Sequence, residues 1–418
     1  TALMVAISGG HAECARLLID AQADLDVTDE HGRTALCWAV AHDSKEIVEQ
    51  LLAAGADVGV ADEDGRTALF CAATKGHLQC LDILVATKAD IGVVDREGRT
   101  ALIYASMHGR ETCLQKLLVL KADSNVVDRN GRSALLWVAE HGHKECLKRL
   151  LIAKADVNSV DQDGFTALSC ASHRGNEECA KMLVYAKADV HMRSTTDGRT
   201  ALICAAQKGH MGCAQLLINA RADLVAEDNE GRTALMWALE NKHFDCAQML
   251  LNADFISKQE KTKTALVWAA ENRFVYCAPT LFYGTSLSRV SALIPLLETM
   301  SVGLSPSMKA KLASYFLLYA AQQNAAGTIK SLLRAHAFVD TRDHEGNSAL
   351  VLAVRSDSSN AFRVLIEGQA DVETRDLSER TLLMNAVTHD HIECVRVLVE
   401  AKADLEAVDN EGNTALIL

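Results

Sequence analysis

The chain has 418 residues and a formal net charge of −13; 49% of its residues are hydrophobic, but only 5% are aromatic. This length can form two or three ordinary domains with a large core, while the acidic balance argues against nucleic acid as a partner, since nucleic acid requires a basic face. No run reaches the roughly 18 consecutive apolar residues of a membrane helix, so direct membrane insertion is not expected.

A short motif, [TS]-A-L, recurs along the chain at a nearly constant interval. The first five steps between its copies are 33 residues each. Self-similarity of this period indicates stacked supersecondary units rather than ordinary domains. The motif begins at Thr1, Thr34, Thr67, Thr100, Ser133, Thr166, Thr200, Thr233, Thr264, Ser348 and Thr414, and a variant, TLL, begins at Thr381.

The unit at 62–94 indicates which elements each copy forms. Its opening DEDGR carries turn chemistry, with Gly65 at a position that favours positive φ. Thr67 is suited to cap a short helix that follows it, and Gly76 ends that helix. A second helix is expected from about His77, followed by an Ala-Asp pair and an extended hairpin that leads into the next turn.

Helix, turn, helix and extended hairpin in every 33 residues resemble the ankyrin repeat over nearly the whole chain. This resemblance implies an all-α fold, a solenoid of about 12–13 stacked helix-turn-helix repeats with β-hairpin-like loops, interrupted around 277–314. The family's T-P-L-H box reads T-A-L-x here. Its last place, whose His normally ties neighbouring repeats by hydrogen bonds, is largely apolar, so we expect apolar contact instead. It holds Met4, Cys37, Phe70, Ile103 and Leu136 in the first copies.

The regular pattern fails towards the C-terminal side of the chain. We expect a repeat array at 1–281, an irregular segment at 282–314 and a second array at 315–418, with the first and last repeats truncated. Two interpretations of the irregular segment stay open: a degenerate repeat with a tolerated insertion, and a break between two stacks or a projecting docking element. All three prolines of the chain fall near it, at Pro279, Pro295 and Pro306.

The thirteen cysteines contain no C-x-x-C pair, which is typical of reduced thiols and points to the cytoplasm, with the nucleus as the alternative. His-x-x-Cys recurs, as at His77 and Cys80, and could form half of a zinc site. The spacing follows the repeat register, however, so we expect buried thiols and no metal. Core packing rather than a disulfide is also expected for three pairs nine residues apart: Cys71/Cys80, Cys170/Cys179 and Cys204/Cys213.

One repeat position is aromatic in many copies, and two interpretations apply to this aromatic row. It can be the seam between neighbouring first helices, which we favour, or a recognition stripe. The row contains Trp38, Tyr104, Trp137, Trp237, Trp268 and Tyr319.

Motifs for catalysis are absent from the sequence. It has no G-x-x-x-x-G-K-[ST], G-x-G-x-x-G, H-E-x-x-H or G-x-S-x-G. We therefore expect no enzyme, no catalytic residue and no cofactor.

The resemblance implies a protein-binding scaffold that holds a protein or peptide on a concave surface of hairpin tips and first helices; no small-molecule ligand is expected. The alternative is the regulatory array of a larger enzyme or channel, such as a kinase, ubiquitin ligase or acyltransferase. Arginines and exposed aromatic rings dominate interface energetics, and Phe165 replaces the Arg of its neighbours. The Asp and Arg ladders at the tips can also be turn chemistry and surface ion pairs.

Two sets of positions carry this prediction. The hairpin tips contribute Glu30, His31, Arg33, Glu63, Asp64, Arg66, Arg96, Glu97, Arg99, Arg129, Asn130, Arg132, Gln162, Asp163, Phe165, Asn229, Glu230 and Arg232. The ends of the first helices add Thr74, Lys75, Met107, His108, Glu140, His141, His173, Arg174, Gln207 and Lys208.

Overall fold

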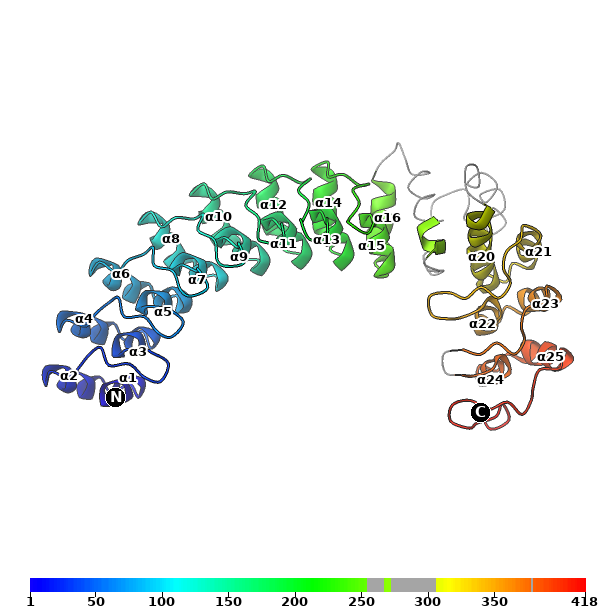
Figure 1. Ribbon diagram of the computed structural model, residues 1–418, viewed down its shortest axis with the longest axis horizontal. Coiled ribbons are helices and arrows are strands. Elements are labelled where there is room, and N and C mark those ends of the chain that lie inside the picture. The colour runs from blue at the N-terminus through cyan, green and yellow to red at the C-terminus, as the bar shows by residue number, and fades with distance from the viewer. Residues whose placement is uncertain (254–266, 272–305, 377–378) are drawn as a thin grey trace. The chain divides into compact units, whose positions relative to one another are not determined.

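A computed structural model describes residues 1–253, 267–271, 306–376 and 379–418 (Figure 1). The chain divides into two compact units, Thr1–Ala234 and Leu235–Leu418. Both are built from pairs of short helices joined by loops, so the predicted all-α repeat solenoid is confirmed.

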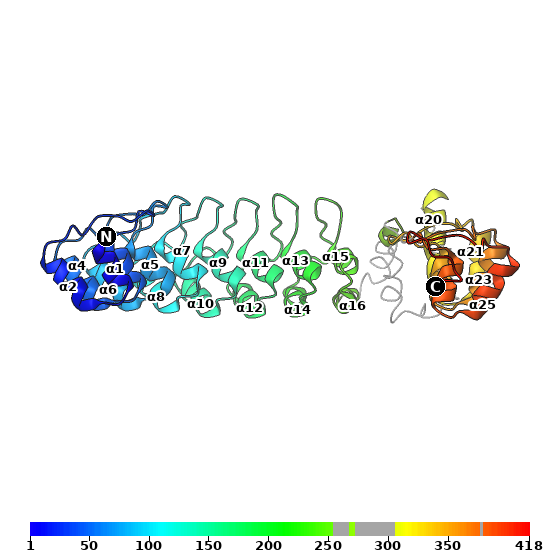
Figure 2. The same cartoon turned by 90° about the horizontal axis from the view of Figure 1, so that it is seen from below.

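In the unit Thr1–Ala234 each repeat contributes an inner and an outer helix. Figure 1 shows the inner, odd-numbered helices on the inside of the curve of this unit, and Figure 2 shows its loops projecting from one edge of the helix rows. The inner helices are α1 (Ala2–Ser8), α3 (Ala35–Ala41), α5 (Ala68–Lys75), α7 (Ala101–Met107), α9 (Ala134–His141), α11 (Ala167–Arg174) and α13 (Ala201–Lys208). The outer helices are α2 (Ala12–Asp20), α4 (Lys45–Ala53), α6 (Leu78–Ala86), α8 (Glu111–Val119), α10 (Lys144–Ile152), α12 (Glu177–Tyr185) and α14 (Met211–Asn219).

The second unit repeats this pairing. Its helix α20 begins at Pro306 and continues through Tyr315, where the sequence pattern places the start of the second array. Residues 257–263, Pro279 and Pro295 lie outside the described residues. The helices are α15 (Ala234–Glu240), α16 (Phe244–Asn252), α20 (Pro306–Gln322), α21 (Ala326–Arg334), α22 (Ala349–Arg355), α23 (Ser359–Glu367), α24 (Leu382–Thr388) and α25 (Ile392–Glu400).

The TAL motif starts the inner helices because the hydroxyl of its Thr or Ser accepts a hydrogen bond from a backbone N–H in the first turn of the helix. The Thr100 hydroxyl accepts the N–H of Ile103 at 3.3 Å. Thr67 stands at the same cap position with extended backbone, although its side chain makes no such bond. Gly76 ends α5 with φ of 87°, in the left-handed region where glycine is favoured, as the sequence predicts.

The core lies between the inner and outer helices. In the third repeat Leu69 and Leu81 are at most 1% exposed, and Cys80 is fully buried. Burial raises the pKa of Cys80 to about 12, so this thiol packs as a small hydrophobic side chain. The cysteines of the three pairs nine residues apart are all free thiols. Cys277 lies outside the described residues.

Hairpins of neighbouring repeats are joined by backbone hydrogen bonds between their tips. The N–H of Arg129 donates to the carbonyl of Glu97 at 2.7 Å, and the N–H of Gln162 donates to that of Asn130 at 2.9 Å. Gly131, with φ of 75°, permits this approach, because a Cβ there would lie 2.9 Å from the Gln162 nitrogen. The tips therefore expose side chains rather than backbone polar groups.

A second set of hydrogen bonds links the start of several outer helices to the inner helix of the preceding repeat. Arg110, the residue before α8, donates its Nε–H to the carbonyl of Thr74 at 2.9 Å. Asn176 Nδ2 donates to the carbonyls of Ala139 at 2.9 Å and Glu140 at 2.7 Å. These bonds satisfy carbonyls that a helix end leaves without partners. The expectation of mostly apolar contact between repeats is thus incomplete.

Candidate functional site on the inner face

Rings of the aromatic row connect their inner helices to the hairpin tip of the same repeat. Tyr104 donates its hydroxyl to Oδ2 of Asp95 at 2.8 Å. Trp38 donates Nε1 to Oδ2 of Asp29 at 3.0 Å. In both cases the two residues are nine positions apart. The aromatic ring therefore stabilises the contact between helix and hairpin within its repeat and also forms part of the inner face.

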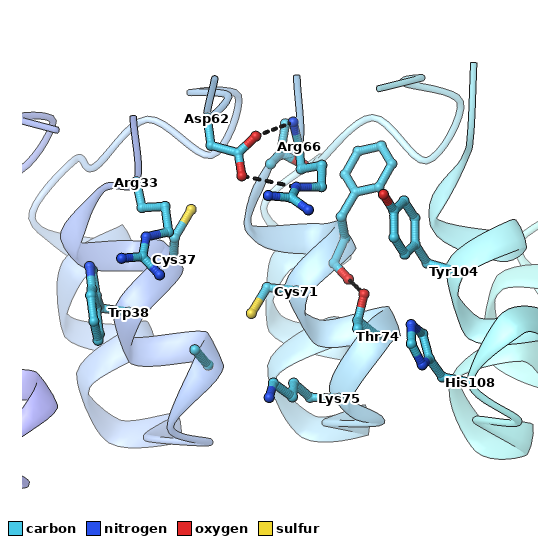
Figure 3. A pocket seen from close by; sticks show the side chains of 13 residues that line it. Arg33, Cys37, Trp38, Asp62, Arg66, Cys71, Thr74, Lys75, Tyr104 and His108 are labelled. Atoms are coloured by element: carbon cyan, nitrogen blue, oxygen red, sulfur yellow. Dashed lines mark hydrogen bonds and ion pairs between the residues drawn. The ribbon is translucent and has the colours of Figure 1, made fainter. Parts of the chain in front are cut away.

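Three repeats carry cysteine at the aromatic position, Cys71, Cys170 and Cys204. Cys204 is buried, whereas Cys71 and Cys170 each line a hollow on the inner face. The first hollow, of about 390 Å³, contains Cys71, with Trp38 from the preceding repeat and Tyr104 from the following one in its walls (Figure 3). The second, of about 300 Å³, contains Cys170. A small side chain therefore stands in both hollows where other repeats place a large ring.

These two cysteines are not suited to nucleophilic chemistry. Burial raises the pKa of Cys71 to about 11, and burial likewise raises the pKa of Cys170 to about 11. The thiolate is the reactive form of cysteine, and it is disfavoured in both hollows. The two hollows therefore offer surfaces for packing, with polar side chains at their rims.

Arginines from the hairpins border the first hollow. Arg66 pairs with Asp62 Oδ2 at 3.0 Å and with Asp64 at 2.6 Å, and Arg33 pairs with Asp29 at 2.9 Å. The side chains of Arg66 and Arg33 are still about 40% and 39% exposed. Both guanidinium groups are therefore held in place by carboxylates and remain accessible from the hollow.

The second hollow is bordered by a different charge arrangement. Glu140 pairs with Arg132 and, at 2.7 Å, with Arg174. Phe165 lines the hollow and is half-buried, so the expectation of an exposed ring is wrong. Because Phe165 replaces the tip Arg, Asp161 keeps only a distant cation, Arg132 Nε at 3.9 Å. Burial accordingly raises the pKa of Asp161.

The predicted tip residues fall into two groups by exposure. The first two variable positions of each hairpin are exposed: Glu30, His31, Glu63, Asp64, Arg96, Glu97, Arg129, Asn130, Gln162, Asp163, Asn229 and Glu230. The position before the TAL motif is half-buried: Arg33, Arg66, Arg99, Arg132, Phe165 and Arg232. Four of these half-buried residues line the two hollows, namely Arg33, Arg66, Arg132 and Phe165.

The prediction from sequence missed the residues at the centre of each hollow. Cys71 and Cys170 were assigned to the core, yet both are only half-buried. The interruption of the aromatic row by a small residue was a partial signal, because Cys204 interrupts the row as well and is buried.

The described residues contain no group of three or more His, Cys, Asp or Glu side chains placed to hold a metal ion. In the same parts of the chain, no helix has both the length and the apolar character needed to cross a membrane.

Comparison with known proteins places the fold in a family. A family model described as ankyrin repeats in three copies matches residues 1–62, 44–125, 111–194 and 186–259, and one described as ankyrin repeats in many copies matches residues 365–418. The search of curated proteins returned no match. Among solved structures, the crystal structure of the ankyrin repeat domain of Bcl-3, described as a unique member of the IkappaB protein family, is similar. It shares 27% sequence identity over 52% of this chain and 97% of that chain, with a TM-score of 0.46. Ankyrin repeats are generally protein–protein interaction modules and are typically non-catalytic, and this chain belongs to the ankyrin-repeat family.

Proposed function

We propose that the unit Thr1–Ala234 binds a protein or peptide segment on its inner face, with side chains of the partner seated in the two hollows. The observation that carries this proposal is the pair of hollows at Cys71 and Cys170, where the aromatic row lacks its ring. The exposed tip residues, from Glu30 to Glu230, form the rim of the same surface.

The first hollow has the chemistry of an anchor pocket. Its walls include the rings of Trp38, Phe70 and Tyr104, and its rim carries Arg33 and Arg66. Aromatic and arginine side chains in desolvated pockets contribute most to interface free energy. The hollow therefore suits an aromatic or long aliphatic side chain with a polar end that reaches the guanidinium groups.

The spacing of the hollows limits the shape of the partner. Cys71 and Cys170 are three repeat steps apart in the sequence. Packed helices lie about 8–10 Å apart, so the two hollows are separated by roughly 25–30 Å. A partner that fills both is an extended segment or a broad protein surface rather than a compact small molecule.

The test is to fill the hollows without disturbing the fold. Cys71→Trp and Cys170→Trp place at each site the residue that Trp38 and Trp137 already provide at the same repeat position. The matched control is Trp137→Tyr, which changes the row at a residue that lines neither hollow. Circular dichroism and size-exclusion chromatography first establish that all variants fold alike.

Partners are then captured from native lysate with each variant and quantified by mass spectrometry. The proposal predicts at least one partner that the parent and Trp137→Tyr retain and that the double variant loses. A set of partners unchanged by filling both hollows would refute binding through them.

A further inference from the structure

Six residues at the C-terminal ends of successive inner helices form a periodic row on the inner face. We call these residues the basic row: His42, Lys75, His108, His141, Arg174 and Lys208. Each is either the last residue of its helix or the position that caps it. Cations are favoured there by the helix dipole, and all six side chains are exposed.

Most members of the basic row make no ion pair with a carboxylate among the described residues, although Asp43 directly follows His42 and Glu140 directly precedes His141 in the sequence. Within the described part of the chain, Arg174 is its one member with a carboxylate in ion-pair range, Glu140 at 2.7 Å. His42 and His141 instead stack on Trp38 and Trp137. The cationic side chains of Lys75 and Lys208 are therefore available to a ligand, in a chain whose net charge is −13 when histidine is counted as neutral.

Further cations lie close behind the row. Burial lowers the pKa of His108, and the nearby positive charges of Arg110, His141, His143 and Lys75 lower it further. Basic side chains from three repeats therefore lie near His108.

A second periodic set of lysines provides a contrast. Lys88, Lys121, Lys154 and Lys187 follow the outer helices, and each is followed two residues later by Asp90, Asp123, Asp156 and Asp189 in turn. All four lysines are exposed. Each of these lysines therefore has a carboxylate in the same loop. Five members of the basic row are instead followed by glycine and then by His, Arg or Asn, and His42 is followed by Asp43.

We propose that the segment held on the inner face is acidic and extended, and that its carboxylates lie along the basic row from His42 to Lys208. This inference rests on the proposed function and adds the charge and shape of the partner. Lys75 and His108 line the first hollow, and Arg174 lines the second. A segment that follows the row therefore passes both hollows.

The length of the segment follows from the geometry. Five repeat steps of about 8–10 Å give a row of roughly 40–50 Å. An extended chain advances about 3.3 Å per residue, so about 12–15 residues span the row. Side chains that fill both hollows are then about eight or nine residues apart in the partner.

The experiment uses the whole chain and fluorescein-labelled 15-residue peptides of glutamate or glutamine, with binding followed by fluorescence anisotropy. The row variant carries Lys75→Gln, Arg174→Gln and Lys208→Gln. The matched control carries Lys88→Gln, Lys121→Gln and Lys154→Gln, which removes the same charge from the outer side.

The glutamate peptide is expected to bind the parent chain about tenfold more tightly than the glutamine peptide, and binding should weaken with added salt. The row variant should lose about tenfold in affinity, as three exposed charge pairs predict, while the control variant keeps the parent value. Equal binding of the two peptides, or equal losses in the two variants, would overturn the proposal.

The same variants separate this inference from the proposed function. A lysate partner that is lost on filling the hollows but held unchanged by the row variant would support protein binding there and refute an acidic segment on the row. Loss of the partner from both variants supports both statements.

Discussion

Trp137 donates its indole N–H to Oδ2 of Asp128 at 3.1 Å, and this bond ties an inner helix to the hairpin tip of the same repeat. Oδ1 of Asp128 meanwhile accepts the N–H groups of Asn130 and Arg132, each at 2.9 Å. The Asp128 side chain is only 1% exposed. Both oxygens of a buried carboxylate are thus satisfied, one by the turn and one by the ring.

Removing that indole donor should destabilise the array. Trp137→Phe keeps an aromatic ring but leaves Oδ2 of Asp128 with Arg99 Nε at 3.7 Å, so we expect a loss of about 1–3 kcal/mol in the free energy of unfolding. Urea titration followed by circular dichroism measures it. Trp137→Tyr is the control, because Tyr104 reaches Asp95 from the same repeat position. Equal stability of the Phe and Tyr variants would contradict a role for the hydrogen bond.

Two tip aspartates should respond in opposite ways to neutralisation. Burial alone would raise the pKa of Asp29, but hydrogen bonds from the Arg33 and His31 backbone and from the Trp38 and Arg33 side chains outweigh it and lower the pKa to about 2. Burial raises the pKa of Asp161. We therefore expect Asp29→Asn to destabilise the protein at pH 7 and Asp161→Asn to be neutral or stabilising.

The pH dependence follows from the same two shifts. An unfolded Asp has a pKa of about 3.9, so Asp29 contributes stability above that pH and loses it as the pH falls through about 2. The contribution of Asp161 to stability has the opposite pH dependence. It is fully present below the pKa of an unfolded Asp, where the carboxyl is protonated, and is lost as the pH rises through the folded pKa. Urea titrations of both variants between pH 7 and pH 2.5 test this. Equal losses in the free energy of unfolding for the two variants at pH 7 would contradict these opposite roles.

The hydrogen bonds of Asn176 should control the coupling between neighbouring repeats. Asn176→Ala leaves the carbonyls of Ala139 and Glu140 without their donor, at a cost of about 1–3 kcal/mol. Hydrogen exchange should show faster opening of α9 to α12 than in the parent. Gln79→Ala, at an exposed position in the first turn of α6, is the control. Unchanged exchange in α9 to α12 would argue against this coupling.

Thiol labelling should follow burial rather than the repeat position. Cys14 is exposed, while burial raises the pKa of both Cys80 and Cys204 to about 12. A maleimide at pH 7 should label Cys14 first and leave Cys80 and Cys204 unmodified until the protein unfolds, as peptide mass spectrometry can show. Labelling in guanidinium chloride is the control, and early labelling of Cys80 in native protein would show that its helix pair opens readily.

The helices could be predicted from sequence because their signals are local. The TAL motif supplies the cap at Thr100, and Gly65 and Gly76 take the positive φ that their turn positions require. The hollows could not be predicted in the same way, because the walls around Cys71 come from residues in three repeats. The hydrogen bond between Trp137 and Asp128 was also missed, because it depends on how a helix and a hairpin of one repeat pack together, which no local sequence signal reports.

Other predictions have different outcomes. Phe165 was expected to be exposed because it replaces an Arg, but a change of residue type does not reveal the depth of a neighbouring hollow, and the ring is half-buried. The division of the chain at 281 and 314 stays a prediction, as does the role of the irregular segment at 282–314.

The aromatic position offers the family a route for changing partners. Each hollow contains one small side chain at a position that every repeat possesses, so exchanging Cys71 with Tyr104 would transfer an anchor pocket to the adjacent repeat, about 8–10 Å away. The backbone and the contacts between repeats need not change, because stability in such arrays is a sum of local terms. Binding specificity can therefore change in discrete steps along the array by paired substitutions at one repeat position, although removing the ring of Tyr104 also removes its hydrogen bond to Asp95.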